Sequence, residues 1–282
     1  MEWVGDARLA AGPEATWYLE TAFTPGAHLA TVYDDPTTPV VVTSIEEVAT
    51  MRVPSGRLVV DAPWDDDDTW RYERGLPTAP PRELAVRIPP GVYRVEIAWT
   101  AGPYEFLGEH FDGVACAATR LCISDDPVIG WEMGLGVDDD IDRLQPGEKP
   151  RFGADANVGC FADAGAWTTL SAPFRTYVDG RPVPRDTEQL PGWWERVRDE
   201  AQQADLVTFT AESGGVVWLG RTKTGDVAAI VVTSGMPGAK ARRGTHRPGA
   251  RRASPLSARC DRPGDRHMSP VTAPGWKPAQ RS

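Results

Sequence analysis

Residues Phe152–Trp167, with the sequence FGADANVGCFADAGAW, bring two aspartates, an asparagine and a cysteine into one short stretch. Asp155, Asn157 and Asp163 supply hard oxygen atoms, so the stretch is a candidate site for Ca²⁺ or Mg²⁺. It departs from an EF-hand loop, because no glycine stands at the sixth position and Ala166 replaces the glutamate of the twelfth. Apart from this ion, the sequence predicts no cofactor.

The same stretch contains Cys160, a candidate catalytic nucleophile. A thiol needs a neighbouring base to become a thiolate, and the sequence VGCFA lacks the second glycine of a nucleophile elbow. In a purely structural interpretation, Cys160 packs in the core and Asp163 caps a helix, which is worth ~1 kcal/mol. The structural interpretation is favoured, and the metal and nucleophile interpretations stay open.

Glu132 is the third candidate catalytic residue, because it lies between Gly130 and Gly134 in an alternating stretch. Glycine inside a strand marks the close approach of a ligand or of another backbone. With Asp155 or Asp163, Glu132 would form a general acid/base couple. These residues predict one alternative function, a divalent-cation-dependent hydrolase that uses a carboxylate cluster.

The elements that position these residues are mainly strands. Residues 84–88 and 93–99 alternate apolar and polar side chains on either side of Pro-Pro-Gly, which is typical of two half-buried strands. Further strands are expected at 114–123, 128–137, 205–211, 214–222 and 225–232, with a hairpin turn at 222–226. In 128–137, alternation predicts one core-facing side that includes Ile129 and Val137. The continuous apolar run at 227–232 predicts a strand that is covered on both faces.

Two helices are expected beside these strands. In residues 191–204, Trp193, Val197, Ala201 and Ala204 form an amphipathic stripe after Pro191. A second, short helix is expected at 163–170, after Asp163. The predicted fold class is mainly β (α+β), an antiparallel sandwich or barrel-like pair of sheets with one or two packed helices.

The charge is distributed unevenly along the chain. The whole chain carries −10 and residues 239–282 carry +9, which leaves −19 on the preceding residues. A strongly acidic body repels nucleic acid and anionic membranes and suits a basic protein partner. No run approaches the ~18 apolar residues of a membrane span. The sequence predicts one domain at 1–237 and a disordered tail at 238–282, because the Arg- and Pro-rich tail has few large apolar residues.

The cysteines indicate a reducing compartment. No CxxC pair occurs among the four cysteines. Cys116 and Cys122 fall on one predicted strand, about 20 Å apart at ~3.3 Å per residue, which exceeds the span of a disulfide. With no secretory signal at the start, a cytoplasmic location is expected.

Five stretches occur in an order that resembles a known family: 53–64, 88–99, 118–135, 152–163 and 207–232. Over residues 50 to 233 the chain is similar to the bacterial domain of unknown function 4241, common in actinobacteria. The resemblance implies no established activity. The family pattern continues past the last strand to a short Asp-Phe ending, from which VTSGMPGAK departs, and this favours a frame-changed tail. The sequence therefore predicts an uncharacterised β-rich protein that acts as a non-catalytic binding or interaction module.

Overall fold

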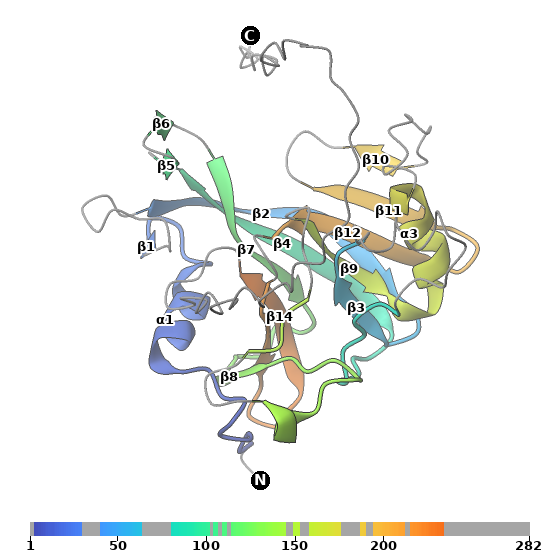
Figure 1. Ribbon diagram of the computed structural model, residues 1–282, viewed down its shortest axis with the longest axis horizontal. Coiled ribbons are helices and arrows are strands. Elements are labelled where there is room, and N and C mark those ends of the chain that lie inside the picture. Colours follow the sequence, from blue (N-terminus) through green and yellow to red (C-terminus); the bar gives the residue numbers. More distant parts are fainter. Residues whose placement is uncertain are drawn as a thin grey trace, which may run out of the picture. The chain divides into compact units, whose positions relative to one another are not determined.

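The computed structural model describes residues 3–29, 40–63, 80–101, 104–106, 109–111, 114–144, 149–152, 158–175, 187–189, 194–211 and 215–233. The chain divides into two units, Met1–Lys240 and Ala241–Ser282, and every described residue belongs to the first. The predicted tail at 238–282 lies outside the described residues. In the described part, the predicted mainly β class with antiparallel sheets and packed helices is confirmed (Figure 1).

Two antiparallel sheets make up most of the described fold. The larger sheet has the order β1 (His28–Leu29), β2 (Val40–Val53), β4 (Gly91–Ala101), β7 (Val114–Cys122), β14 (Val227–Thr233), β13 (Val217–Arg221) and β8 (Gly130–Met133). The smaller has the order β10 (Thr187–Gln189), β11 (Glu195–Asp199), β12 (Ala204–Thr210), β9 (Val158–Asp163) and β3 (Leu58–Asp61). A third sheet pairs β5 (Tyr104–Phe106) with β6 (Glu109–Phe111), between β4 and β7 in the chain.

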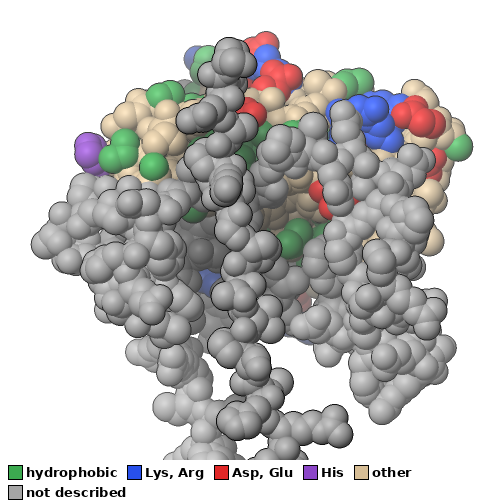
Figure 2. Space-filling model, turned by 90° about the horizontal axis from the view of Figure 1, so that it is seen from above, with side chains coloured by type: hydrophobic (Ala, Val, Ile, Leu, Met, Phe, Trp, Pro, Cys, Tyr) green, Lys and Arg blue, Asp and Glu red, His purple; other side chains and the backbone are tan. Residues whose placement is uncertain are grey.

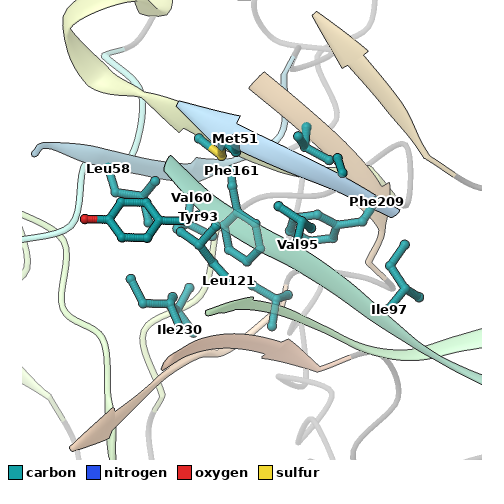
Figure 3. Close-up of a cluster of buried hydrophobic side chains, with 14 of the residues drawn as sticks. Met51, Leu58, Val60, Tyr93, Val95, Ile97, Leu121, Phe161, Phe209 and Ile230 are labelled. Atoms are coloured by element: carbon teal, nitrogen blue, oxygen red, sulfur yellow. The ribbon is translucent and has the colours of Figure 1, made fainter. Parts of the chain in front are cut away.

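The main core lies between the two large sheets, where their apolar side chains meet (Figure 3). Tyr93, Val95, Ile97 and Trp99 all belong to this core, which confirms the alternation predicted for 93–99. From the smaller sheet, Phe161 and Phe209 meet at a ring-centroid distance of 4.7 Å. The sheets are therefore held face to face by side chains of period two, as in a sandwich.

One helix covers the outer face of each large sheet. Helix α1 (Pro13–Thr21) buries Tyr18 and Leu19 against the larger sheet, and the Tyr18 hydroxyl donates to the carbonyl of Ala117 at 3.2 Å. Helix α3 (Trp167–Arg175), preceded by the 3₁₀ turn η2 (Ala164–Ala166), buries Leu170 and Phe174 against the smaller sheet. The two helices lie on opposite sides of the strands (Figure 1). Strand β14 is buried along its whole length, which confirms the prediction for 227–232.

The helix predicted at 191–204 is wrong. Its described part, from residue 194 on, contains β11, a turn and the start of β12, with Val197 opposite Leu206 in the ladder. The turn is fixed by Asp199, whose carboxylate accepts from the backbone and side-chain amides of Gln202, and by Gln203 at φ 54°. Pairing with β12 therefore outweighs the helical propensity of the Glu-Ala-Gln-Gln segment, and the apolar stripe was a coincidence of spacing.

Of two other predicted strands, one is absent and the other is shorter than expected. Residues 84–88 form no strand, because Glu83 and Leu84 make only isolated bridges to Val59 and Gly136. Within 128–137 only Gly130–Met133 is a strand, and the predicted core residues Ile129 and Val137 are exposed. Both segments lie near the edges of the sheets, where regular pairing is short and the residues beyond it do not follow the alternation of a strand.

The hairpin turn predicted at 222–226 is confirmed. The backbone N–H of Thr222 donates to the carbonyl of Asp226 at 2.9 Å, and Gly225 takes φ +92°. A left-handed conformation of this kind favours glycine. Among the described helices, none is long and apolar enough to cross a membrane.

Candidate functional site

The structure places the predicted site residues in two different sheets. Glu132 lies on β8, at the outer edge of the larger sheet, whereas Cys160 and Asp163 lie on β9 in the smaller one. Asp155 and Asn157, the other predicted metal ligands, lie outside the described residues. The hydrolytic combination of Glu132 with Asp155 or Asp163 therefore stays a prediction.

Asp163 is a helix cap, as the sequence predicts. Its Oδ1 accepts hydrogen bonds from the backbone N–H groups of Gly165 at 2.8 Å and Ala166 at 3.2 Å, which begin the turn η2 before α3. Its Oδ2 accepts from both the backbone N–H and the hydroxyl of Ser55, at 2.9 and 2.7 Å. Both oxygens of this buried carboxylate are thus occupied by protein donors, which satisfies a charge that burial would otherwise penalise.

The bonds to Ser55 attach α3 to a tight turn between β2 and β3. The turn includes Gly56 at φ +65°, where an added β-carbon would lie 2.5 Å from the carbonyl oxygen of Ile88. Glycine is therefore required both by the backbone conformation and by the closeness of Ile88. Asp163 connects three pieces of chain here: this turn, strand β9 and the start of the helical segment.

Cys160 is fully enclosed and packs with Leu170 and Phe174 of α3. Burial, with a smaller contribution from the charge of Asp61, raises the pKa of its thiol well above the ordinary value. A buried protonated thiol acts as a small apolar side chain rather than as a nucleophile. These contacts agree with the structural interpretation of this residue.

Glu132 is paired with Arg221 of the neighbouring strand β13. Its Oε1 accepts from Nε of Arg221 at 2.8 Å and from Nη2 at 2.5 Å. The third nitrogen of the guanidinium, Nη1, donates to the carbonyl of Gly225 at 3.0 Å. The side chains of Glu132 and Arg221 are only 10% and 16% exposed, so the pair forms a largely buried link between β8, β13 and the hairpin turn.

The glycine that precedes Glu132 is explained by the N-terminal segment. An added β-carbon at Gly130 would lie 2.7 Å from Cζ3 of Trp3, and one at Gly225 would lie 2.9 Å from Cδ1 of the same ring. The indole of Trp3 therefore lies directly against both glycines. The predicted close approach at Gly130 is real, and what approaches is a side chain of the chain itself. Gly134, by contrast, faces Val217.

Several further carboxylate–arginine pairs were missed by sequence reasoning. Glu83 accepts from Arg57 and Arg87, and these hydrogen bonds hold the pKa of its carboxyl below the ordinary value. Asp205 is buried and accepts from the backbone and guanidinium of Arg52, with which it joins the two sheets. Arg52 and Asp205 are 153 residues apart in sequence. No local pattern could therefore have revealed the pair.

Three aspartates of the acidic run at 136–142 are held by ion pairs or a helix cap. Asp139 binds Arg82 at 2.6 Å, Asp142 binds Arg8 at 2.7 Å, and Asp140 caps η1 (Ile141–Arg143) by accepting from the N–H of Asp142. Among the described residues, no group of three or more His, Cys, Asp or Glu is placed to hold a metal ion. The second acidic run, Trp64–Trp70, lies outside the described residues.

Cys122 is the most accessible of the three described cysteines, none of which forms a disulfide with another described residue. Partial burial raises the pKa of its thiol, and the charge of Glu96 adds to this effect, whereas Arg120 and Arg94 act in the opposite direction. Cys116 and Cys122 lie on one strand and form no disulfide with each other, which agrees with their predicted separation. Arg94 lies opposite Cys122 and Glu96 opposite Arg120 in the ladder, and the guanidinium of Arg120 lies over the ring of Phe23, at 4.0 Å from its centroid.

Comparison with known proteins gives one match. A family described as "Protein of unknown function (DUF4241)" matches residues 51–235. The match includes Glu132, Cys160 and Asp163, whereas Trp3 and helix α1 precede it. No curated protein and no solved structure matches the chain.

Proposed function

The chain belongs to the DUF4241 family of proteins of unknown function, and we propose that it is a non-catalytic binding module for a basic protein partner in the cytoplasm. The observation that carries the proposal is that many arginines are paired with carboxylates of the same chain. Arginines of the described residues are engaged by internal carboxylates, namely Arg8, Arg52, Arg57, Arg82, Arg87, Arg94, Arg120, Arg143 and Arg221. Figure 2 shows acidic and basic side chains side by side on the described surface.

This pairing leaves the negative charge in excess at the surface. Glu20 of α1 and Glu47 of β2 are exposed, and the described residues supply neither with an ion-pair partner. We call these two residues the acidic face. The segments that carry them are connected, because the N–H of Gly26 donates to the carbonyl of Val42 and the N–H of Val42 donates to the carbonyl of Ala27. Glu47 lies opposite Glu96 in the ladder. A face of this kind attracts a cationic surface and accelerates its association.

The predicted catalytic residues support a binding role through their contacts. Asp163 is occupied by backbone and hydroxyl donors, Glu132 by an arginine, and Cys160 by apolar neighbours. A general acid or base needs a free oxygen within hydrogen-bond reach of a substrate. The divalent-cation-dependent hydrolase remains the alternative, and it requires Asp155 or Asn157 to supply ligands. A cytoplasmic location is part of the proposal and is supported by the free cysteines.

The test uses the full chain and a fluorescent heptalysine peptide as a probe of stated chemistry. Stopped-flow association is measured at two ionic strengths for the wild type, for Glu20→Gln/Glu47→Gln and for the control Asp138→Asn/Asp226→Asn. The control removes the same charge from exposed acids elsewhere. We expect the association rate to fall about tenfold between low and high salt, because screening shortens the range of steering.

The two double variants distinguish binding at the acidic face from attraction by the net negative charge of the whole chain. A binding face predicts a rate several-fold lower for Glu20→Gln/Glu47→Gln than for the control. Equal losses of association rate in both variants would show that net negative charge, and not the acidic face, attracts the peptide. Absence of association in the wild type at low salt would remove the basic partner from the proposal.

A further inference from the structure

Trp3 is held against the edge of the larger sheet by its backbone and by its ring. Its N–H donates to the carbonyl of Lys223 in the β13–β14 turn at 3.1 Å. Its indole lies against Gly130 on β8 and Gly225 in the turn, so close that a β-carbon at either position would clash with the ring. We call the surface formed by Gly130, Gly225 and the Glu132–Arg221 pair the indole site.

The polar part of the indole site is preorganised. Arg221 is fixed by Glu132 on one side and by the carbonyl of Gly225 on the other. Among the described hydrogen bonds, those to Glu132 end on Oε1, whereas Oε2 lies beside Gly5, with 3.2 Å to a β-carbon added there. An aromatic ring therefore lies against two glycines that offer no side chain of their own, and one of them, Gly225, also accepts from Arg221 of the ion pair.

The residues that follow Trp3 add a short strand to β8. Ala10 bridges Glu132 in antiparallel register. The N–H of Ala11 donates to the carbonyl of Trp131, and the N–H of Met133 donates to the carbonyl of Leu9, both at 2.8 Å. Between Trp3 and this pairing the chain makes a turn, in which the N–H of Leu9 donates to the carbonyl of Asp6 at 2.9 Å. Pairing of a short segment with the edge of a sheet, with a side chain inserted beside it, is the geometry of peptide recognition by strand addition.

The indole site lies inside the family match, whereas the segment that occupies it lies outside. Gly130, Glu132, Arg221 and Gly225 all fall within residues 51–235, whereas residues 3–11 precede them. The family domain thus contributes the site, and a segment outside the family match fills it. Arg8 of that segment also reaches Asp142 at 2.7 Å, so a basic residue is accommodated next to the edge.

From these contacts we infer that the indole site and the β8 edge form a peptide-binding site that residues 3–11 occupy in cis. The partner is a peptide that carries an aromatic residue, a turn with an arginine and a short edge-pairing segment. This inference rests on the proposed binding function and deepens it, because it gives the basic partner a second, aromatic feature. Residues 3–11, which we call the cover, are part of the same chain and compete with the partner at an effective concentration in the millimolar range. The partner therefore binds weakly until the cover leaves the site.

The experiment measures binding of a labelled peptide with the sequence of residues 2–12, EWVGDARLAAG, to the full chain by fluorescence anisotropy. The releasing variant is Trp3→Ala/Ala11→Pro, which removes the ring and the N–H that Trp131 accepts. The control is Trp17→Ala, because Trp17 is 45% exposed on α1, outside the cover. We expect the releasing variant to bind the peptide about tenfold more tightly than the wild type or the control.

Two further measurements keep the inference open to refutation. Gly130→Val, added to the releasing variant, fills the place of the ring and is expected to abolish peptide binding. Equal binding by all variants, or equal binding of a peptide whose Trp is replaced by Ala, would overturn the inference. Heptalysine association at the acidic face would be unaffected by that result, so the two proposals fail separately.

If the releasing variant does not fold, the single variant Trp3→Ala is melted with and without free indole. Indole that refills the site raises the midpoint of Trp3→Ala and leaves that of Trp17→Ala unchanged. No rise for Trp3→Ala would show that the indole site has no affinity of its own, and the inference would be wrong.

Discussion

Oε1 of Glu132 accepts two hydrogen bonds from Arg221, although the two residues are 89 positions apart in the chain. They meet because β8 and β13 are antiparallel neighbours, with Arg221 opposite Gly130 and Leu219 opposite Glu132. The pair is diagonal in the ladder, which is within reach of two long side chains. Glu132 is thus a counter-ion that positions Arg221 for its bond to Gly225, and this predicts what its replacement does.

Replacing Glu132 by Gln should destabilise the fold. Removing one partner of a buried ion pair costs about 3–5 kcal/mol, and the retained amide oxygen of Gln should reduce the loss to about 2 kcal/mol. Urea unfolding of the full chain measures the loss. Arg221→Met combined with Glu132→Gln should cost less than the sum of the single changes, because the pair is lost only once. Strict additivity would contradict the role of Glu132 as a counter-ion.

Replacing Asp163 by Ala should weaken the attachment of α3. The loss of the cap costs about 1 kcal/mol and the loss of two hydrogen bonds from Ser55 to a charged group about 1.5–3 kcal/mol more. Ser55→Ala removes only the hydroxyl bond and should cost less than Asp163→Ala. Both are measured by urea unfolding against Asp126→Asn, an exposed aspartate. A larger loss for Ser55→Ala than for Asp163→Ala would be incompatible with these contacts.

The sequence predicts best those features that arise from near neighbours. Tyr93, Val95 and Ile97 alternate within one strand, and Asp163 caps the residues that directly follow it. Such features depend on periodicity and local hydrogen bonding, which a sequence carries in full. The hairpin turn at Gly225 belongs to the same class.

What the sequence could not provide is the pairing of distant segments. The segment after Pro191 has a helical stripe at Trp193 and Val197, but β12 supplies a ladder that no local propensity indicates. The glycine at 130 signals a close approach without identifying Trp3, which lies 127 positions earlier. The candidate site residues were therefore found by type, whereas their partners required the three-dimensional fold.

Glu83 should contribute to acid sensitivity. Its pKa is lowered in the folded state, mainly by Arg57 and also by Arg87, so its contribution to stability is present above the unfolded pKa of about 4.3. That contribution is lost as the pH falls through the folded pKa, because the unfolded state then binds the extra proton first. Unfolding free energies measured from pH 6 down to pH 3 should fall less steeply for Glu83→Gln than for the wild type. Parallel curves would exclude Glu83 as a cause.

The described cysteines should differ in reactivity with a thiol reagent. In a Cys260→Ser background, Cys122 should react first because it is only partly buried, whereas Cys160 should react only on unfolding. The raised pKa of Cys160 also predicts a pH effect. Above the unfolded thiol pKa of about 8.5, only the unfolded state loses the proton, so stability falls as the pH rises. Cys160→Ala should reduce that slope, and rapid native labelling of Cys160 would contradict its burial.

Divalent cations test the remaining metal hypothesis. Ca²⁺, Mg²⁺ or Mn²⁺ bound to the folded state at 100 times its dissociation constant adds about 2.7 kcal/mol, which raises the melting midpoint visibly. Because donors already occupy both oxygens of Asp163, we expect any such rise to depend on Asp155 and Asn157 rather than on Asp163. Asp155→Asn should then abolish the rise, while Asp163→Asn should lower the midpoint equally with and without the ion. A rise that disappears only in Asp163→Asn would mean that the ion displaces Ser55, and the carboxylate cluster of a hydrolase would become the better explanation.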